Sequence, residues 1–199
     1  VPAKENSTVS LSWQTLTLRQ KRSLLLLPAL AAVGSPAMAL LPALAQQIQP
    51  EDAAGLALPL LFARSMGQLC GPLLLKRDSL TRFAAHTPRL LICLAVFLAA
   101  YGTLPFFSGW VACALAAIFV AHLASNIVFA AGTFGVLSSF QAVQISAASG
   151  KAWRWQTLSA SLFTGIAAMT AAEYGAIHAL YAISTGALLL VAVVLYCYA

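Results

Sequence analysis

The sequence predicts an all-α polytopic membrane protein, a bundle of six transmembrane helices. Of its 199 residues, 61% are hydrophobic and only 8% are charged, whereas a soluble domain carries roughly 25% charged residues. The hydrophobic residues form long runs, and the basic residues fall in short clusters between those runs. Lipid is therefore predicted to be the solvent for most of the protein surface.

Six apolar runs reach, or nearly reach, the roughly 20 residues that a helix needs to cross a bilayer. Residues 90–150 contain no Asp, Glu, Lys or Arg. Two spans are predicted to share this stretch and to separate at residues 105–109, where Pro, Ser and Gly cluster. The last two spans are predicted to be joined by a tight turn at residues 173–175. The predicted spans are residues 23–46, 53–75, 90–107, 110–141, 156–172 and 176–198.

The basic residues predict how the bundle is oriented. Ten of the eleven lie before the first span or in the loops after the second and fourth spans. Because cytoplasmic loops are enriched in Lys and Arg, we expect both termini in the cytoplasm and the bundle in the plasma or inner membrane. Residues 1–22 are predicted to be a cytoplasmic linker or interfacial segment, and residues 23–199 to be the transmembrane domain.

The sequence disfavours several other classes of protein. The formal net charge of +6 is divided among membrane flanks, so no nucleic-acid partner is predicted. The cysteines form no CxxC pair, which favours neither a disulfide framework nor a zinc site. We find no cluster with metal-ligand spacing and no nucleotide-binding glycine loop, and we predict neither a metal nor a cofactor. The cysteines are Cys70, Cys93, Cys113 and Cys197.

The remaining basic residue, Arg64, lies near the middle of the second span. A charge at that depth is costly and is retained mainly where it faces a partner or a watery cavity. Arg64 and Gln68 share a helix face with Gly67 and Gly71. We predict that Arg64 and Gln68 bind a solute, and the positive charge of Arg64 favours an anionic one. Alternatively, Arg64 is a structural hydrogen-bond hub or a snorkelling side chain. The G-x-x-x-G spacing of the two glycines favours close helix packing.

A second polar set, His122, Ser125 and Asn126, lies with Thr133 on one side of the fourth span. Within a stretch that lacks formal charge, such a stripe faces protein or water rather than lipid. We predict that it lines the solute cavity and that His122 is a candidate for proton coupling; the alternative is that interhelical hydrogen bonds satisfy it. Glu173 is a second candidate for proton coupling, although an exposed loop carboxylate is the simpler interpretation.

Catalysis is an alternative role for some of these polar residues. His122 and Asn126, followed by Ser149 and His178, superficially resemble the residues of rhomboid-type intramembrane serine proteases, in which a serine and a histidine form the catalytic dyad. The predicted topology places Ser149 at the cytoplasmic edge and His178 near the outer edge. We therefore predict that the protein is not an enzyme.

Three features resemble the C-terminal six-helix half of a major facilitator superfamily transporter. A basic linker, Arg19-Gln-Lys-Arg22, leads into a first span with Ala39-Leu-Leu-Pro42-Ala-Leu near its outer end. The second span ends in Gly71-Pro-Leu-Leu-Leu-Lys-Arg-Asp78, where the family often has Gly-x-x-x-Asp-Arg-x-Gly-Arg; the second glycine and the arginine pair are missing here. The last two spans are joined by Glu173-Tyr-Gly-Ala-Ile-His-Ala-Leu180, similar to a short acidic-aromatic-Gly connection in the family.

The resemblance implies two six-helix halves that rock about a central site, which Arg64, Gln68, His122 and Asn126 would face. We predict a secondary active transporter, or half of one, that moves a small organic solute by ion-coupled alternating access. Its expected partners are the bilayer, the solute, and a second six-helix half or another subunit. The alternative is a non-transporting membrane subunit or scaffold of a larger complex. The chain begins at Val1 without a methionine and ends inside an apolar run, so we expect it to be part of a longer protein.

Overall fold

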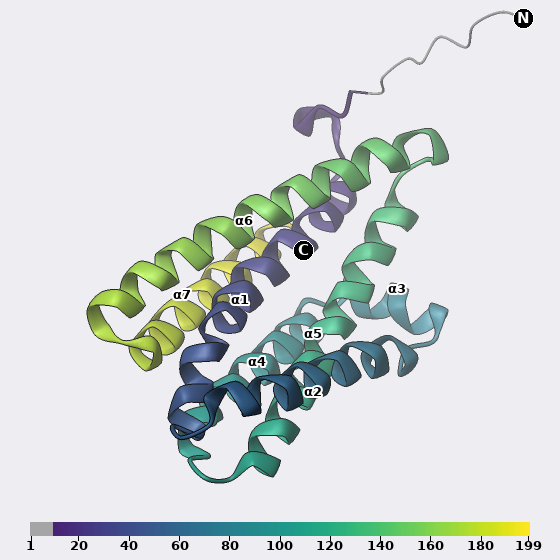
Figure 1. Cartoon of the computed structure of the whole chain (residues 1–199). Coiled ribbons are helices and arrows are strands. Elements are labelled where there is room, and N and C mark those ends of the chain that lie inside the picture. The colour runs from purple at the N-terminus through teal and green to yellow at the C-terminus, as the bar shows by residue number, and fades with distance from the viewer. Residues whose placement is uncertain (1–9) are drawn as a thin grey trace, which may run out of the picture.

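The computed structural model describes residues 10–199, which form a bundle of helices (Figure 1). This part of the chain contains no strand, so the predicted all-α class is confirmed. The α-helices are α1 (Leu18–Ile48), α2 (Ala53–Leu73), α3 (Arg77–Ala85), α4 (Thr87–Thr103), α5 (Val111–Ser139), α6 (Ile145–Tyr174) and α7 (Ala176–Cys197). Three short 3-10 helices are η1 (Trp13–Thr15), η2 (Leu104–Phe106) and η3 (Ala142–Gln144).

Five helices of the described chain are long and apolar enough to cross a membrane, namely α1, α2, α4 with η2, α5 and α7. The remaining predicted span lies within α6, which is less apolar than the others. This helix begins at Ile145 rather than at Gln156, so Lys151 and Arg154 belong to the helix and not to a loop. The alanine-rich stretch between Ile145 and Lys151 contains no proline, and it continues the helix. A sixth membrane span therefore stays a prediction.

Two other boundaries differ from the prediction. The basic loop after α2 contains the short helix α3, which has Asp78 in its first turn and Arg82 in its last, as the helix dipole favours. The first helix begins at Leu18, ahead of the predicted residue 23. A capping box explains this start: the Thr17 side chain accepts a hydrogen bond from the Gln20 amide, and the Gln20 side chain accepts one from the Thr17 amide.

The predicted break at residues 105–109 is confirmed, and the turn predicted at residues 173–175 is limited to Gly175, because α6 continues to Tyr174. Gly109 has φ of +75° in the turn before α5, and Gly175 has φ of +86° in the turn between α6 and α7. Glycine adopts these angles without the steric cost that a Cβ atom would impose. The Gly109 amide also donates a hydrogen bond of 3.0 Å to the carbonyl of Ile48, which fixes this turn against the end of α1.

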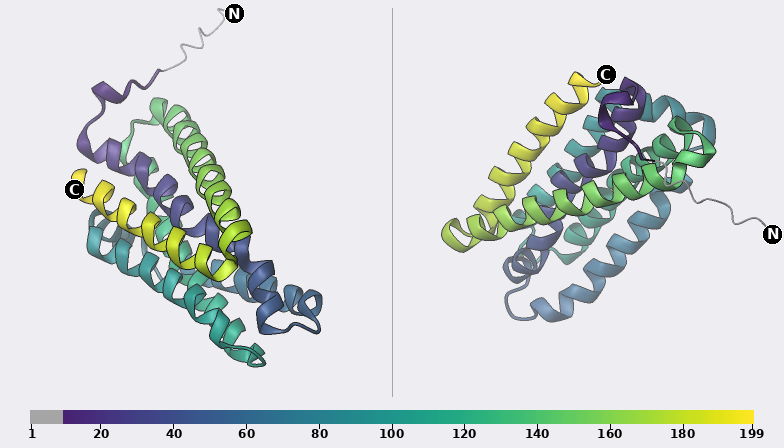
Figure 2. Two further views of the ribbon diagram at one scale, coloured as in Figure 1. Left: turned by 90° about the vertical axis from the view of Figure 1, so that its left-hand side faces the viewer. Right: turned by 90° about the horizontal axis from the view of Figure 1, so that it is seen from above.

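The six long helices form two groups that each draw on both halves of the chain. In one group α1, α6 and α7 contact one another, and in the other α5 packs against α2 and α4 (Figures 1 and 2). If α1, α2 and α4 are matched in chain order with α5, α6 and α7, the group of α1, α6 and α7 corresponds to the group of α5, α2 and α4. Helices α1 and α5 run in opposite directions (Figure 1). The correspondence is partial, because α6 and α7 contact each other whereas α2 and α4 share no comparable contact.

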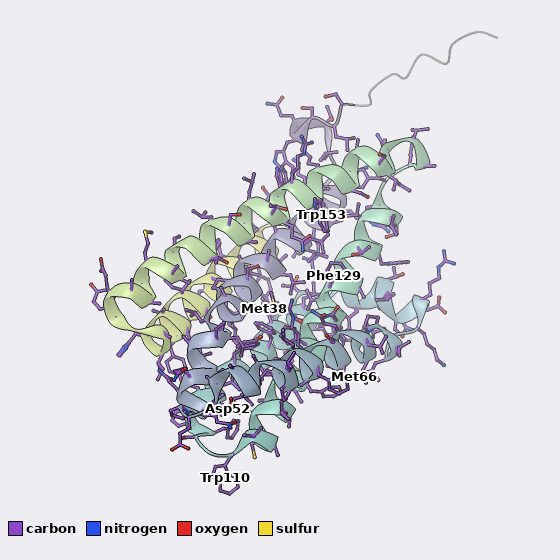
Figure 3. The ribbon with its side chains drawn as sticks, in the orientation of Figure 1. Met38, Asp52, Met66, Trp110, Phe129 and Trp153 are labelled. Carbon is purple, nitrogen blue, oxygen red and sulfur yellow. The ribbon has the colours of Figure 1, made fainter. Side chains whose placement is uncertain are left out.

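The helix directions also separate the charges. The turns between α1 and α2 and between α6 and α7 lie toward the lower left of Figure 1. Glu51 and Asp52 belong to the first of these turns, and Glu173 lies at the end of α6 next to the second. Figure 3 shows Asp52 and the exposed Trp110 toward that side. The starts of α1, α4 and α6, together with α3, lie toward the opposite side, which we call the basic end. These segments carry Asp78 and the described basic residues other than Arg64, namely Arg19, Lys21, Arg22, Lys76, Arg77, Arg82, Arg89, Lys151 and Arg154.

The segment before α1 folds back onto the bundle at the basic end. The ring of Trp13 lies 5.3 Å from that of Trp155 on α6 and 5.9 Å from that of Tyr198. The Lys151 ammonium donates a hydrogen bond of 2.7 Å to the carbonyl of Leu11. The described part of the predicted linker is thus packed against α6 and the end of α7; residues 1–9 of that linker lie outside the described part.

Gly67 and Gly71 bring the backbone of α2 against that of α5. A Cβ atom added at Gly71 would lie 2.7 Å from the carbonyl oxygen of Leu123, and one added at Gly67 would overlap the carbonyl oxygen of Phe119. Because both obstacles are backbone atoms, they cannot move aside as a side chain can. The close packing predicted from the G-x-x-x-G spacing is confirmed.

We expect Gly67→Ala and Gly71→Ala each to lower the free energy of unfolding by about 1–3 kcal/mol, the usual cost of overpacking. Thermal unfolding of the purified protein in detergent measures this. Gly165→Ala and Gly186→Ala are matched controls, because nothing lies within 4 Å of a Cβ atom at either position. Equal unfolding temperatures for all four variants would contradict the close contact.

Candidate functional site

A cavity of about 460 Å³ lies between the two helix groups. Helices α1, α5 and α6 supply most of its lining, whereas α2 and α4 each contribute one side chain, Gln68 and Phe97. Figure 3 labels three of the lining residues: Met38 on α1, Phe129 on α5 and Trp153 on α6. The cavity is therefore lined by helices of both groups.

Four of the residues predicted to bind solute lie together in this lining: Gln68, His122, Ser125 and Asn126. The last three share one side of α5. The contact at Gly71 places α2 next to Asn126, since a Cβ atom there would lie 3.1 Å from the Asn126 Cβ atom. The same contact brings Gln68, one helical turn from Gly71, to the edge of the polar stripe.

His122 is held in place by two aromatic residues of α4. It is 1% exposed, and its Nε2 atom lies 2.8 Å from the hydroxyl oxygen of Tyr101. The ring of Phe97 packs against both, at 5.7 Å from His122 and 4.7 Å from Tyr101. We did not single out Tyr101 from the sequence. The sequence does place the Tyr101 hydroxyl inside an apolar span. This position could have indicated a polar contact between helices, because a buried tyrosine usually has a hydrogen-bond partner.

Ser125 and Asn126 are oriented by the backbone of their own helix. The Ser125 hydroxyl donates a hydrogen bond of 3.2 Å, and the Asn126 side-chain amide one of 3.1 Å, to the carbonyl of His122. The amide nitrogen of Asn126 is thereby engaged. Its side-chain oxygen has no hydrogen-bond partner among the described residues, and it can accept a hydrogen bond.

Helix α6 contributes polar residues that the sequence analysis missed. Gln156, Thr157 and Ser161 line the cavity on the side opposite α5, and the Gln156 Oε1 atom is buried without a hydrogen-bond partner. A buried unpaired acceptor is costly unless a ligand or water satisfies it. The available signal was the spacing of Thr157 and Ser161, which are four residues apart on one face of the helix.

Two of the predicted site residues lie outside the cavity. Arg64 lines a separate cavity of about 400 Å³ between α1 and α2, although Met38 borders both cavities. Glu173 is exposed in the last turn of α6. It lies 12 residues beyond Ser161 (173 − 161) in the same helix, a distance of about 18 Å along the axis. The coupling role of Glu173 and the solute-binding role of Arg64 stay predictions.

The structure also keeps the residues of the catalytic alternative apart. Ser149 lies exposed in the second turn of α6, near the basic end, and His178 lies exposed in the first turn of α7, at the other end. His122 is buried between them in the bundle. Across residues 10–199, no group of three or more His, Cys, Asp or Glu side chains is placed to hold a metal ion.

The lining is suited to a neutral solute that forms hydrogen bonds. It contains amides, hydroxyls and one imidazole, and no Asp, Glu, Lys or Arg. The rings of Phe97, Phe129 and Trp153 add apolar surface against which a flat group can pack. A few convergent polar groups in an apolar wall are typical of small-molecule sites. An anionic solute, which the charge of Arg64 predicted, would have no cationic side chain to bind in this cavity.

Comparisons with protein-family models, with curated proteins and with solved structures gave no match to this chain.

We expect Tyr101→Phe to lower the free energy of unfolding by about 1 kcal/mol, because the variant leaves the buried Nε2 atom of His122 without its partner. Thermal unfolding in detergent measures the change. Tyr196→Phe is the control, since Tyr196 is 57% exposed. If both variants unfold at the wild-type temperature, the hydrogen bond to His122 contributes nothing to stability.

Proposed function

We propose that this chain is a secondary active transporter, or the membrane-embedded half of one, and that it moves a small organic solute by alternating access. The observation that carries the proposal is a cavity between the two helix groups, whose uncharged lining combines amide, hydroxyl and imidazole groups with apolar side chains. Transporters built from inverted repeats hold their substrates at the interface of the repeats, and they expose the site to each side in turn by rocking one unit against the other.

The charge distribution supports insertion into a bilayer. Five helices have the length and composition to cross a membrane, and α6 is proposed as the sixth span. The basic residues at one end fit the cytoplasmic side of a plasma or inner membrane, with both termini on that side. Trp13, Trp155 and Tyr198 gather at this end, where aromatic side chains favour the membrane–water interface.

The proposed relation to the major facilitator superfamily concerns the arrangement of the helices. In that family each six-helix half contains two three-helix repeats of inverted direction. The proposal is supported in part by the helix contacts, since α1 packs against α6 and α7 as α5 packs against α2 and α4. A second six-helix half, or another subunit, is the proposed partner, and it would close the cavity from the other side. We propose an ion gradient as the energy source, with His122 and Glu173 as candidate proton carriers.

Water in the cavity distinguishes a transporter from a non-transporting scaffold subunit. We expect Gln68→Cys and Gln156→Cys to react with a membrane-impermeant thiol reagent, in nanodiscs and in a background without the four native cysteines. Leu69→Cys and Leu158→Cys are neighbouring controls, because these leucines are 61% and 67% exposed on the apolar outer surface, and lipid would shield them. Labelling of the controls together with protection of the cavity pair would contradict the proposal.

Transport itself is measured with the complete protein in proteoliposomes. A panel of nucleosides, aromatic amino acids and hexoses is first screened for a solute that raises the unfolding temperature, and uptake of that solute is then followed. We expect uptake to fall when proton and sodium ionophores collapse both gradients. Asn126→Ala and Gln156→Ala should each lower uptake about tenfold, because each variant removes one hydrogen bond to the solute. Leu69→Ala should leave uptake unchanged.

Uptake that continues unchanged after both gradients are collapsed would overturn the ion coupling. If no solute of the panel is taken up and the cavity cysteines are also protected, the scaffold alternative replaces the transporter.

A further inference from the structure

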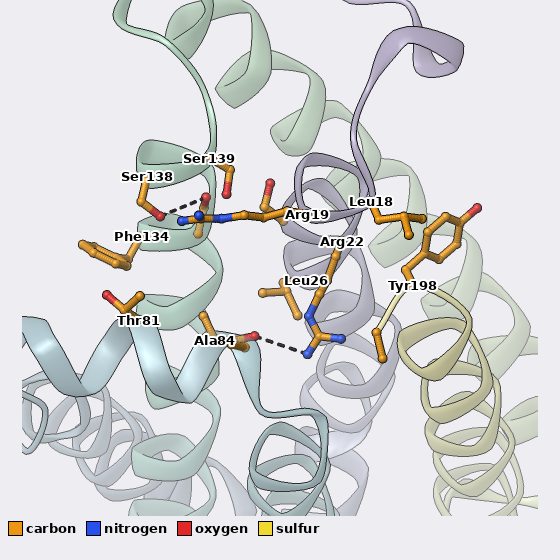
Figure 4. A pocket seen from close by; sticks show the side chains of 14 residues that line it. Leu18, Arg19, Arg22, Leu26, Thr81, Ala84, Phe134, Ser138, Ser139 and Tyr198 are labelled. Atoms are coloured by element: carbon orange, nitrogen blue, oxygen red, sulfur yellow. Dashed lines mark hydrogen bonds between the residues drawn. The ribbon is translucent and has the colours of Figure 1, made fainter.

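A separate cavity of about 410 Å³ lies at the basic end, where α1, α3, α5 and α7 meet (Figure 4). Two arginines of α1, Arg19 and Arg22, belong to its lining. Hydroxyl groups of Thr81, Ser138 and Ser139 line it from α3 and α5, and no Asp or Glu side chain does. The lining therefore combines two positive charges with neutral hydrogen-bond donors.

Arg22 is the buried member of this lining, at 8% exposure. Its Nη1 atom donates a hydrogen bond of 3.1 Å to the carbonyl of Leu195, and its Nη2 atom donates one of 3.3 Å to the carbonyl of Ala84. Both acceptors are in the last turns of helices, α7 and α3, where backbone carbonyls lack partners within the helix. These contacts fix the guanidinium in place, but neutral carbonyls do not cancel its charge.

A further donor of Arg22 is unused. The Nε atom is buried and has no hydrogen-bond partner. A guanidinium has five N–H donors, and an anion beside the Nε side would supply both the missing acceptor and the missing negative charge. The unpaired Nε atom is thus a second observation, independent of the cavity, that points to an anionic ligand.

Arg19 adds a second cation to the same pocket. Figure 4 shows its side chain extending from α1 towards Ser138 and Ser139 on α5. It is exposed, and it forms no side-chain hydrogen bond with the described residues. Arg19 is therefore free to bind a ligand that enters the pocket.

The walls of the pocket are apolar. Leu18, Leu26 and Phe134 line it beside the arginines. The pocket also lies at the same end as the aromatic cluster of Trp13 and Trp155, the level at which lipid headgroups would lie if this end is at a membrane surface. The site thus offers apolar contact next to an anion-binding group.

We propose that this pocket binds the phosphate group of an anionic phospholipid, with Arg19 and Arg22 as its ligands. Arginine matches the geometry of phosphate through paired N–H donors, and basic pockets between transmembrane helices hold anionic headgroups. Inorganic phosphate presents the same oxygens, but it has no acyl chain to contact Leu26 and Phe134. The site is distinct from the solute cavity, and it does not depend on transport.

Arg19→Gln tests the proposal with little risk to the fold, because the Arg19 side chain is exposed. Arg154→Gln is the matched control: it removes the same charge at the same end, from an exposed residue outside the pocket. Delipidated whole protein in detergent is titrated with phosphatidylglycerol and with phosphatidylcholine, and binding is followed by native mass spectrometry and unfolding temperature. Inorganic phosphate is titrated in a separate arm.

We expect phosphatidylglycerol to bind more tightly than phosphatidylcholine. Arg19→Gln should weaken phosphatidylglycerol binding about fivefold, the usual effect of one basic residue, and Arg154→Gln should leave it unchanged. Equal binding of the two lipids, or equal weakening by the two variants, would overturn the specific site. Stabilisation by inorganic phosphate as strong as that by phosphatidylglycerol would overturn the lipid and assign the pocket to free phosphate.

Discussion

The arrangement of the bundle depends on the backbone contact between α2 and α5 at Gly67 and Gly71. Any larger side chain at these positions would meet the carbonyl oxygens of Phe119 and Leu123. The contact sets which side of each helix is buried. It directs Gln68 towards the same space as His122 and Asn126, and it leaves Leu69, the next residue of α2, on the outer surface. The position of the polar cavity thus follows from two residues without side chains.

Polar groups inside the bundle are satisfied locally, which leaves a few of them for a ligand. The carbonyl of His122 accepts from Ser125 and Asn126, and Tyr101 engages the imidazole. In an apolar environment such pairing is needed, because an unpaired buried group costs free energy. Four buried atoms among the described residues have no partner: Arg22 Nε, Thr133 Oγ1, Gln156 Oε1 and Ser184 Oγ. Arg22 and Gln156 belong to residues that line a cavity, whereas Thr133 and Ser184 line none of the three cavities described.

Much of the fold could be predicted from hydrophobicity and charge, because the distribution of apolar and charged residues along the chain follows the solvent that each segment faces. It does not depend on the details of helix packing. The turns at Gly109 and Gly175 and the contact at Gly67 and Gly71 followed from local residue types. Of the predicted polar stripe of α5, His122, Ser125 and Asn126 line one cavity, whereas Thr133 does not line it. The placement of Arg64 in a separate cavity was not readable, because it depends on how α1 packs against α2. The cavity-lining residues of α6 were missed although they lie inside the predicted span 156–172, because mean hydropathy does not show which side of a helix faces the protein interior.

The central claim is that α6 crosses the bilayer with its polar face towards the cavity. Spin labels placed along α6 in nanodiscs report collisions with oxygen, which concentrates in lipid, and with a water-soluble nickel complex. Labels at Leu158, Leu162 and Met169, which are more than 60% exposed, should favour oxygen. Labels at Gln156, Thr157 and Ser161 should favour nickel. Nickel accessibility along the whole outer face of α6 would contradict the account, because the helix would then lie outside the membrane and could not close a transport cavity.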